Sequence, residues 1–203
     1  MWQWLLRVDY SAFKAINGLA GKNGSLDWLV RVFVNDHFVP AVLGLMLMVM
    51  LLKGRDRSAD RANIDGVVKV ILTLALANFA VSLITVFITR NRPFIDHSVP
   101  HLLFYTPTDS SFPSNPAAAT FAFFAGALLT DRRFAWWYLP PAVLMSFSRL
   151  IAGVCYPGDV LAGIALAFIA ALLVQRLNFL TRPITDMAYL VESRLRATIS
   201  QRE

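Results

Sequence analysis

Three short polar clusters lie at the ends of apolar runs, and their residue types suit the binding of an anion. The stretch 148–159, around which the rest of the chain is organised, places Arg149 and Asp159 between two long apolar runs. The other two contain Arg92 and the segment 112–116. A charged side chain costs about 2.5–3.5 kcal/mol or more at the centre of a bilayer, so charges beside apolar runs are usually functional, at an interface or in a wet cavity. We therefore expect the three clusters to converge on one anion.

Arg92 and Arg149 suit a phosphate group in particular. The planar guanidinium fork makes bidentate, charge-assisted hydrogen bonds, and it stays charged in any environment. At the outer ends of two different helices, the two arginines could clamp one phosphate from two sides. Each could instead anchor its helix at the interface, with the charged head in water. The nearby Asp159 and the polar segment 112–116 favour the clamp.

The run Pro113-Ser114-Asn115-Pro116 predicts the start of a helix. Ser114 or Asn115 suits the N-cap, and Pro116 suits the first helical position because no N–H is needed there. A helix N-terminus also offers unpaired N–H groups and a partial positive charge, which attract an anion. The capping role and the anion-binding role are compatible.

The composition indicates an integral membrane protein. The 203 residues are 57% hydrophobic and only 16% charged, whereas about 25% is typical of soluble proteins. The net charge of +6 comes from basic residues in loops between apolar runs, which commonly set membrane orientation. No basic helix face or basic-aromatic module is evident, so nucleic-acid binding is not expected. The N-terminus lacks a signal-peptide pattern, and the single cysteine excludes an internal disulfide.

The apolar runs predict an all-α bundle within a single domain, 1–203. Five transmembrane helices are expected at 39–52, 66–89, 117–129, 134–154 and 160–174, or six if 26–36 forms another. The bundle should occupy 26–177, with amphipathic interfacial helices at 1–23 and 184–199. Ser25 is a suitable N-cap for a helix that begins at Leu26.

Basic loops predict the orientation of the bundle. Loops 53–61 and 131–133 and the C-terminal tail are rich in arginine, so they should lie on the cytoplasmic side. Alternation of the spans then places the clusters around Arg92, Ser114 and Arg149 together on the external face.

These clusters resemble the three-part signature of the type 2 phosphatidic acid phosphatase superfamily, which is Arg-Pro, Pro-Ser-Gly-His or Pro-Ser-Asp-His, and Ser-Arg-x5-His-x3-Asp. The matching residues here are Arg92-Pro93, Pro113-Ser114-Asn115, and Ser148-Arg149 with Asp159. The flanking segments 13–19 and 92–94 look like the bacterial undecaprenyl-diphosphate phosphatase branch. The similarity extends over nearly the whole chain.

The resemblance implies a multi-pass protein of the bacterial inner membrane. Members of that branch remove a phosphate from a C55 isoprenoid diphosphate at the outer face, with no metal or other cofactor. A histidine nucleophile forms a phospho-enzyme, a second histidine protonates the leaving group, and arginines stabilise the charge. By the same resemblance, the phosphate-binding residues here would be Arg92, Ser114, Asn115 and Arg149, and Asp159 would orient the nucleophile.

The chain departs from the signature at both histidines. Pro116 stands at the general-acid position and Cys155 at the nucleophile position, while Thr85 stands where many members carry a lysine. Proline has no titratable group and cannot act as an acid. The carboxylate of Asp159 would raise the pKa of a neighbouring thiol, and the two arginines would lower it. A reactive thiolate and an inert thiol at Cys155 are both compatible with the sequence.

The sequence predicts a protein that binds a polyprenyl phosphate or diphosphate in the bilayer, with weak or lost hydrolysis. One alternative is an active lipid phosphatase that uses Cys155 as nucleophile, or His97 or His101 as the acid. Another is a non-catalytic sensor or flippase for a carrier lipid. A third is that Pro116 and Cys155 replace histidines of an active parent protein. The sequence indicates no particular oligomeric state.

Overall fold

The computed structural model describes residues 2–53, 57–97, 99 and 101–200. These residues form helices joined by loops, and no strand is found among them. The helices are α1 (Trp2–Asn17), α2 (Gly24–Phe33), α3 (Phe38–Leu52), α4 (Arg57–Phe87), α5 (Pro93–Asp96), α6 (Asn115–Leu128), α7 (Arg132–Ile151), α8 (Pro157–Arg176) and α9 (Asn178–Ser200). The prediction of an all-α membrane bundle is confirmed.

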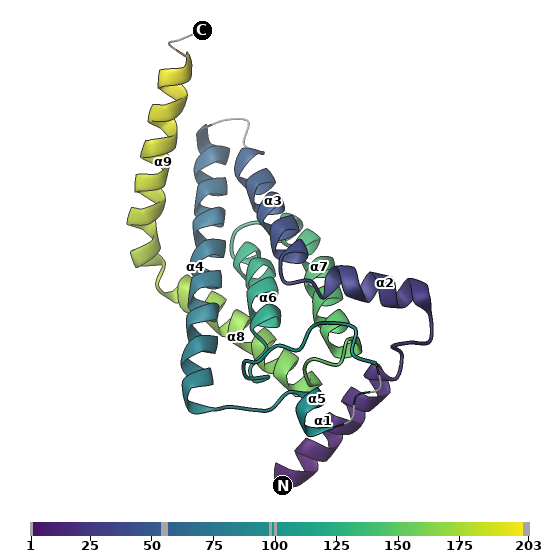
Figure 1. Ribbon diagram of the computed structural model, residues 1–203. Coiled ribbons are helices and arrows are strands. Elements are labelled where there is room, and N and C mark those ends of the chain that lie inside the picture. The colour runs from purple at the N-terminus through teal and green to yellow at the C-terminus, as the bar shows by residue number, and fades with distance from the viewer. Residues whose placement is uncertain (1, 54–56, 98, 100, 201–203) are drawn as a thin grey trace.

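Helix α6 lies at the centre of the bundle, among α3, α4, α7 and α8 (Figure 1). Its buried face is rich in alanine and glycine, and such small residues let helix backbones approach closely. Gly163 of α8 shows how close this approach is, because a Cβ there would lie 2.4 Å from the carbonyl oxygen of Ser114. A glycine at 163 therefore lets α8 pass directly beside the start of α6.

Two helices in the described part of the chain are long and apolar enough to cross a membrane. They are Asp60–Phe87 within α4 and Pro157–Arg176, which is α8. Helices α2 and α3 would make a third span if they act as one, although they are bent by 59° at the break between them. Helix α6 is apolar but has only 14 residues. The expectation of five or six spans therefore stays a prediction.

Several predicted boundaries are wrong. Helix α2 begins at Gly24, and its N-cap is Asn23, whose side chain accepts from the N–H groups of Ser25 and Leu26. Ser25 thus lies inside the helix that it was expected to cap. Helix α4 begins at Arg57, so part of the basic loop predicted at 53–61 is helical.

The two terminal helices attach to the bundle differently. Helix α1 contacts α7 and α8 at the end of the bundle that carries α5 (Figure 1). Helix α9 runs beside the first part of α4, where Arg61 pairs with Asp186 and the hydroxyl of Thr185 donates to Asp65 at 3.2 Å. It begins at Asn178, earlier than the predicted start at 184. The interfacial location of both helices stays a prediction.

Candidate phosphate-binding site

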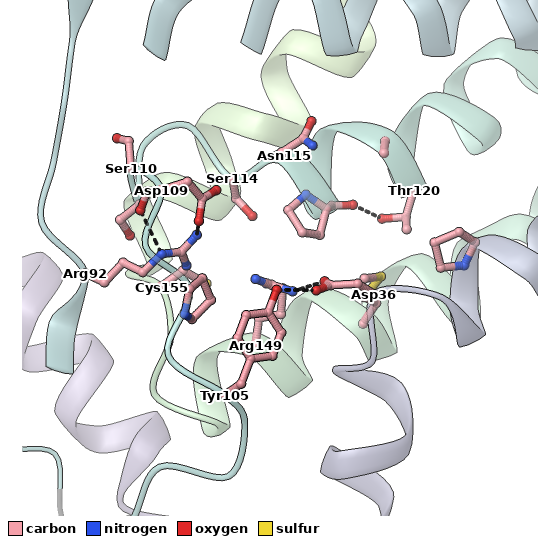
Figure 2. Close-up of a pocket in the computed structure, with 16 residues that line it drawn as sticks. Asp36, Arg92, Tyr105, Asp109, Ser110, Ser114, Asn115, Thr120, Arg149 and Cys155 are labelled. Carbon is pink, nitrogen blue, oxygen red and sulfur yellow. Dashed lines mark hydrogen bonds and ion pairs between the residues drawn. The ribbon is translucent and has the colours of Figure 1, made fainter. Parts of the chain in front are cut away.

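A cavity of about 270 Å³ opens where α6 begins and α7 ends (Figure 2). Four loop segments supply its walls together with the starts of α3 and α6 and the end of α7. Its polar and sulfur-bearing lining includes Asp36, Arg92, Tyr105, Asp109, Ser114, Asn115, Arg149 and Cys155, and Pro116 also lines it. The structure therefore brings together every site residue predicted from the sequence except Asp159.

The turn between α7 and α8 carries Cys155 into this cavity. Gly153 makes the turn with φ of +83°, and a Cβ there would lie 2.8 Å from Cγ1 of Val99. Both the backbone conformation and the close contact favour glycine. The side chain of Asn17 in α1 donates to the carbonyl of Ile151 at 2.8 Å, which ties the turn to the N-terminal helix.

Arg92 immediately precedes α5 and is almost completely hydrogen-bonded by the protein. Its Nη1 donates to the carbonyl of Val154 at 2.7 Å. Its Nε donates to the backbone carbonyl of Asp109 at 3.1 Å, and its Nη2 donates to the carboxylate of Asp109 at 2.8 Å. The guanidinium is therefore fixed against the turn that carries Cys155, and Asp109 covers its other edge.

Arg149 lies in the last turn of α7 and keeps a donor free. Its Nη1 donates to Oδ1 of Asp36 at 2.8 Å, and Tyr105 donates its hydroxyl to Oδ2 of the same carboxylate at 2.7 Å. This bond to Asp36 is the main reason why the pKa of Tyr105 is raised. The Nε of Arg149 is buried and has no partner among the described residues.

Ser114 is the N-cap of α6, as predicted, but its side chain makes no capping bond. Its N–H donates to the carbonyl of Asp159 at 3.0 Å. Its hydroxyl is buried at the cavity without a partner in the described part of the chain. Asn115 begins the helix, so Pro116 takes the second helical position and not the predicted first one.

Asp159 lies outside the cavity lining, in a network that sequence reasoning did not find. Its Oδ1 accepts from Nη1 of Arg90 at 2.7 Å, and its Oδ2 accepts from the hydroxyl of Ser111 and from the N–H of Tyr156. Nη2 of Arg90 also donates to Asp9 of α1 at 2.8 Å. The carboxylate of Asp159 thus fixes the start of α8, and none of these hydrogen bonds is made to the thiol of Cys155.

Cys155 is a buried thiol, only 1% exposed. Burial raises its pKa to about 12, although Arg149 and Arg92 act in the opposite direction. A thiol with such a pKa is almost entirely protonated at neutral pH, and the neutral thiol is a poor nucleophile. The inert alternative that the sequence left open is therefore the one that this environment favours.

Neither loop histidine lines the cavity. The ring of His97 lies 3.9 Å from that of Tyr10 in α1. The imidazole of His101 packs on Gly21, where an added Cβ would lie 2.8 Å from it. Among the described residues, no cluster of three His, Cys, Asp or Glu side chains is arranged to hold a metal.

The fold and the cavity define an all-α membrane protein with arginines around a polar pocket at one end of its bundle. The sequence pattern of the PAP2 superfamily matches residues 66–182. The chain is also 32% identical to the undecaprenyl-diphosphatase BcrC of Bacillus subtilis, over 89% of each chain. It therefore belongs to the PAP2 superfamily, and the family predicted from the sequence is confirmed.

Other relatives agree with this placement. YbjG of Escherichia coli is 26% identical over 84% of this chain and 83% of its own. The crystal structure of LpxE from Aquifex aeolicus matches the fold with a TM-score of 0.64 at 23% identity, covering 83% of this chain and 95% of that one. A PAP2-type phosphatidylglycerolphosphate phosphatase from Bacillus subtilis matches with a TM-score of 0.56 at 19% identity, covering 83% and 85%. The two structures establish the similarity of the fold.

Proposed function

We propose that this protein binds a polyprenyl phosphate or diphosphate in the cavity at the external face of a bacterial membrane, and that it hydrolyses the lipid slowly or not at all. One observation carries the proposal. Arg149 and Ser114 both line the cavity, and Nε of the arginine and the hydroxyl of the serine are buried without a protein partner among the described residues. Buried polar groups are nearly always hydrogen-bonded, so an orphan pair at a cavity points to a ligand.

The chemistry of these groups favours an anion with several oxygens. Arg149 offers a charged N–H, and Ser114 offers a hydroxyl that can donate. Both lie beside the N-terminus of α6, a helix of 14 residues, where the helix dipole favours negative charge. A phosphate group could accept from both side chains at once, which a single carboxylate oxygen would do less well.

A lipid is the natural carrier of this phosphate. Pro40, Ala119 and Met145 line the same cavity as the polar groups, so an apolar tail could leave between the helices. A relative that matches most of this chain is an undecaprenyl-diphosphatase by name, and we extend the lipid class, though not the reaction, to this protein.

Two departures from the family signature argue against efficient hydrolysis. Pro116 faces the cavity where the signature has a general acid, and Cys155 is a protonated thiol where it has a nucleophile. General acid–base catalysis alone typically contributes about 10²–10⁴-fold to a rate. Losing the acid and weakening the nucleophile should remove most of the activity.

An active lipid phosphatase is the second candidate, and the 32% identity to an undecaprenyl-diphosphatase favours it. It would require Cys155 to ionise when the ligand is bound, or His97 or His101 to move into the cavity. We rank it second because the thiol is buried and because both histidines pack against the N-terminal segment.

The external location rests on the two ends of α7. Arg132 and Arg133 begin this helix, and Arg149 lies in its last turn. The seventeen steps of α-helix from residue 132 to residue 149 span about 26 Å at 1.5 Å per step, close to the thickness of a hydrocarbon core. If the basic end is cytoplasmic, the cavity opens on the other side.

Replacing Arg149 tests the proposal. We expect Arg149→Ala to weaken the binding of farnesyl diphosphate to the detergent-solubilised protein by about 10–100-fold, because a charge-assisted hydrogen bond contributes about 1.5–3 kcal/mol. Isothermal titration with a chelator present measures the affinity. Arg176→Ala is the matched control, since it removes the same charge at the opposite end of α8. Equal affinities of the Arg149→Ala variant and the unmodified protein would contradict the proposal.

A further inference from the structure

The two arginines of the cavity differ in which edge of the guanidinium is free. A guanidinium binds a phosphate best through two N–H groups on one edge, such as the edge formed by Nε and Nη2. In Arg149 the bond to Asp36 uses Nη1, and the buried Nε has no partner in the described residues. The Nε edge of Arg149 therefore carries an unpaired donor while Asp36 holds Nη1.

Arg92 has no comparable free edge. Its Nε and Nη2 both donate to Asp109, one to the backbone carbonyl and the other to the carboxylate, and its Nη1 donates to Val154. A phosphate oxygen can reach Nη2 of Arg92 only where the carboxylate of Asp109 now lies, while Nε keeps its bond to the backbone carbonyl. The carboxylate of Asp109 thus occupies the place that a phosphate oxygen would take.

The two carboxylates also differ in how firmly they are held. The side chain of Asp109 is 68% exposed and that of Asp36 is 32% exposed. Asp36 is bound by two partners, Arg149 and Tyr105. Asp109 itself loses little when it rotates into water, but Arg92 is only 5% exposed, so the exchange requires an anion that takes the place of the carboxylate on this buried guanidinium.

We propose that Asp109 is an internal competitor of the ligand, which sets the affinity of the site, and that Asp36 is a positioning residue. This inference rests on the proposed phosphate-binding function. The phosphate first binds the edge of Arg149 that carries the unpaired Nε, beside Ser114. It then displaces the carboxylate of Asp109 from Arg92, and Asp36 with Tyr105 continues to hold Arg149 in place.

The arrangement also predicts selectivity for charge. With both carboxylates in place, the two arginines of the cavity are neutralised, so a weakly charged ligand gains little on entering. A phosphate group that carries about two negative charges can replace the single charge of Asp109 and leave a net gain. A carboxylate ligand has the same charge as Asp109 and gains nothing by the exchange. The site should therefore prefer phosphate and diphosphate groups to carboxylates.

Asp109→Asn tests the competition. We expect this variant to bind farnesyl diphosphate about tenfold more tightly than the unmodified protein, because the competing charge is gone while the size of the side chain is kept. Inorganic diphosphate should show the same ratio, which separates the headgroup from the lipid tail. Asp36→Asn should instead weaken binding, because Arg149 loses the partner that orients it.

Asp96→Asn is the matched control. Asp96 lies in α5 and accepts from the side chain of Asn91 at 2.9 Å, away from the cavity lining. The Asp96→Asn substitution removes the same charge from a nearby part of the chain. A general electrostatic effect would therefore raise the affinity equally in Asp96→Asn and Asp109→Asn. Equal gains in Asp96→Asn and Asp109→Asn, or no gain in Asp109→Asn while the unmodified protein binds, would overturn the inference. If neither the unmodified protein nor any variant binds, the proposed function itself fails, and this inference falls with it.

Discussion

Arg90 and Arg92 are two residues apart, yet the structure uses them in different ways. Arg90 joins three parts of the chain, because it pairs with Asp159 at the start of α8 and with Asp9 in α1. Arg92 pairs with Asp109, and both residues line the cavity. The ion pairs of Arg90 hold α1 and α8 together beside the site. The ion pair of Arg92 occupies a guanidinium that a ligand could bind.

The exposure of the partner carboxylate separates these two roles. Asp159 is fully buried and satisfied by Arg90, Ser111 and the N–H of Tyr156, while most of the side chain of Asp109 is in water. Burial lowers the pKa of Arg90, but Asp159 and Asp9 raise it by more, so that it lies above its ordinary value. A buried carboxylate with several partners is costly to disturb, whereas the exposed carboxylate of Asp109 can be exchanged for another anion on Arg92.

Asp159→Asn removes the buried partner of Arg90, and we expect it to have the largest effect on the stability of the protein. It leaves Arg90 without its buried partner, which typically lowers the free energy of unfolding by about 3–5 kcal/mol. Denaturation of the protein in mixed detergent micelles measures this quantity. Asp186→Asn is the control, because its ion pair with Arg61 is about half exposed and should contribute about 0.2–1 kcal/mol. Similar losses in the free energy of unfolding of the two variants would mean that the Arg90 network does not stabilise the fold more than an exposed ion pair does.

The reactivity of Cys155 tests whether burial or the two arginines of the cavity determine the ionisation of its thiol. A pKa of about 12 lies about three units above that of a free thiol, which lowers the thiolate fraction at pH 8 about a thousandfold. We expect alkylation by iodoacetamide at pH 8 to be slower than in the denatured chain by at least this factor, and to accelerate as the pH rises toward 12. Rapid labelling of the folded protein at pH 8 would show that the arginines outweigh burial and that the thiolate is available.

Much of the candidate site was predictable from local features. Arg92 and Arg149 carry charge at the ends of apolar runs, and the segment around Ser114 has the residue types of a helix start. These signals depend only on neighbours in the sequence. Helix bounds were less predictable, as Ser25 illustrates, because Asn23 was equally suited to cap α2 and the structure uses it.

The partners of these residues were not predictable in the same way. Asp36 lies 113 residues from Arg149 in the sequence, and a single sequence gives no signal that pairs them. The roles of Asp109 and Asp9 were unpredictable for the same reason, because each partner arginine is distant in sequence or lies in another segment. The only signal in the sequence was that these three carboxylates lie close to apolar runs, where a charged side chain usually has a partner.

Cys155 shows a different limit. The opposing effects of the arginines and Asp159 on the thiol could be listed from the sequence, but their balance could not be decided. The dominant cause is burial, which depends on how the turn after α7 packs on α1 and α8. Asp159 shows the same limit, since its role as part of the Arg90 network appears only when α1, α8 and the loop before α5 are placed together.

The most direct test of the account introduces histidines at the two positions where the sequence predicts the general acid and the nucleophile. We would measure phosphate release from undecaprenyl diphosphate by the purified protein in detergent with a chelator, beside the double variant Pro116→His with Cys155→His. The account predicts weak or absent release by the unmodified chain and clear turnover by the double variant, because the arginines and the helix start of the phosphate pocket remain in place. Robust turnover by the unmodified chain would contradict the account, and loss of that turnover in Cys155→Ser would then identify the thiol as the nucleophile.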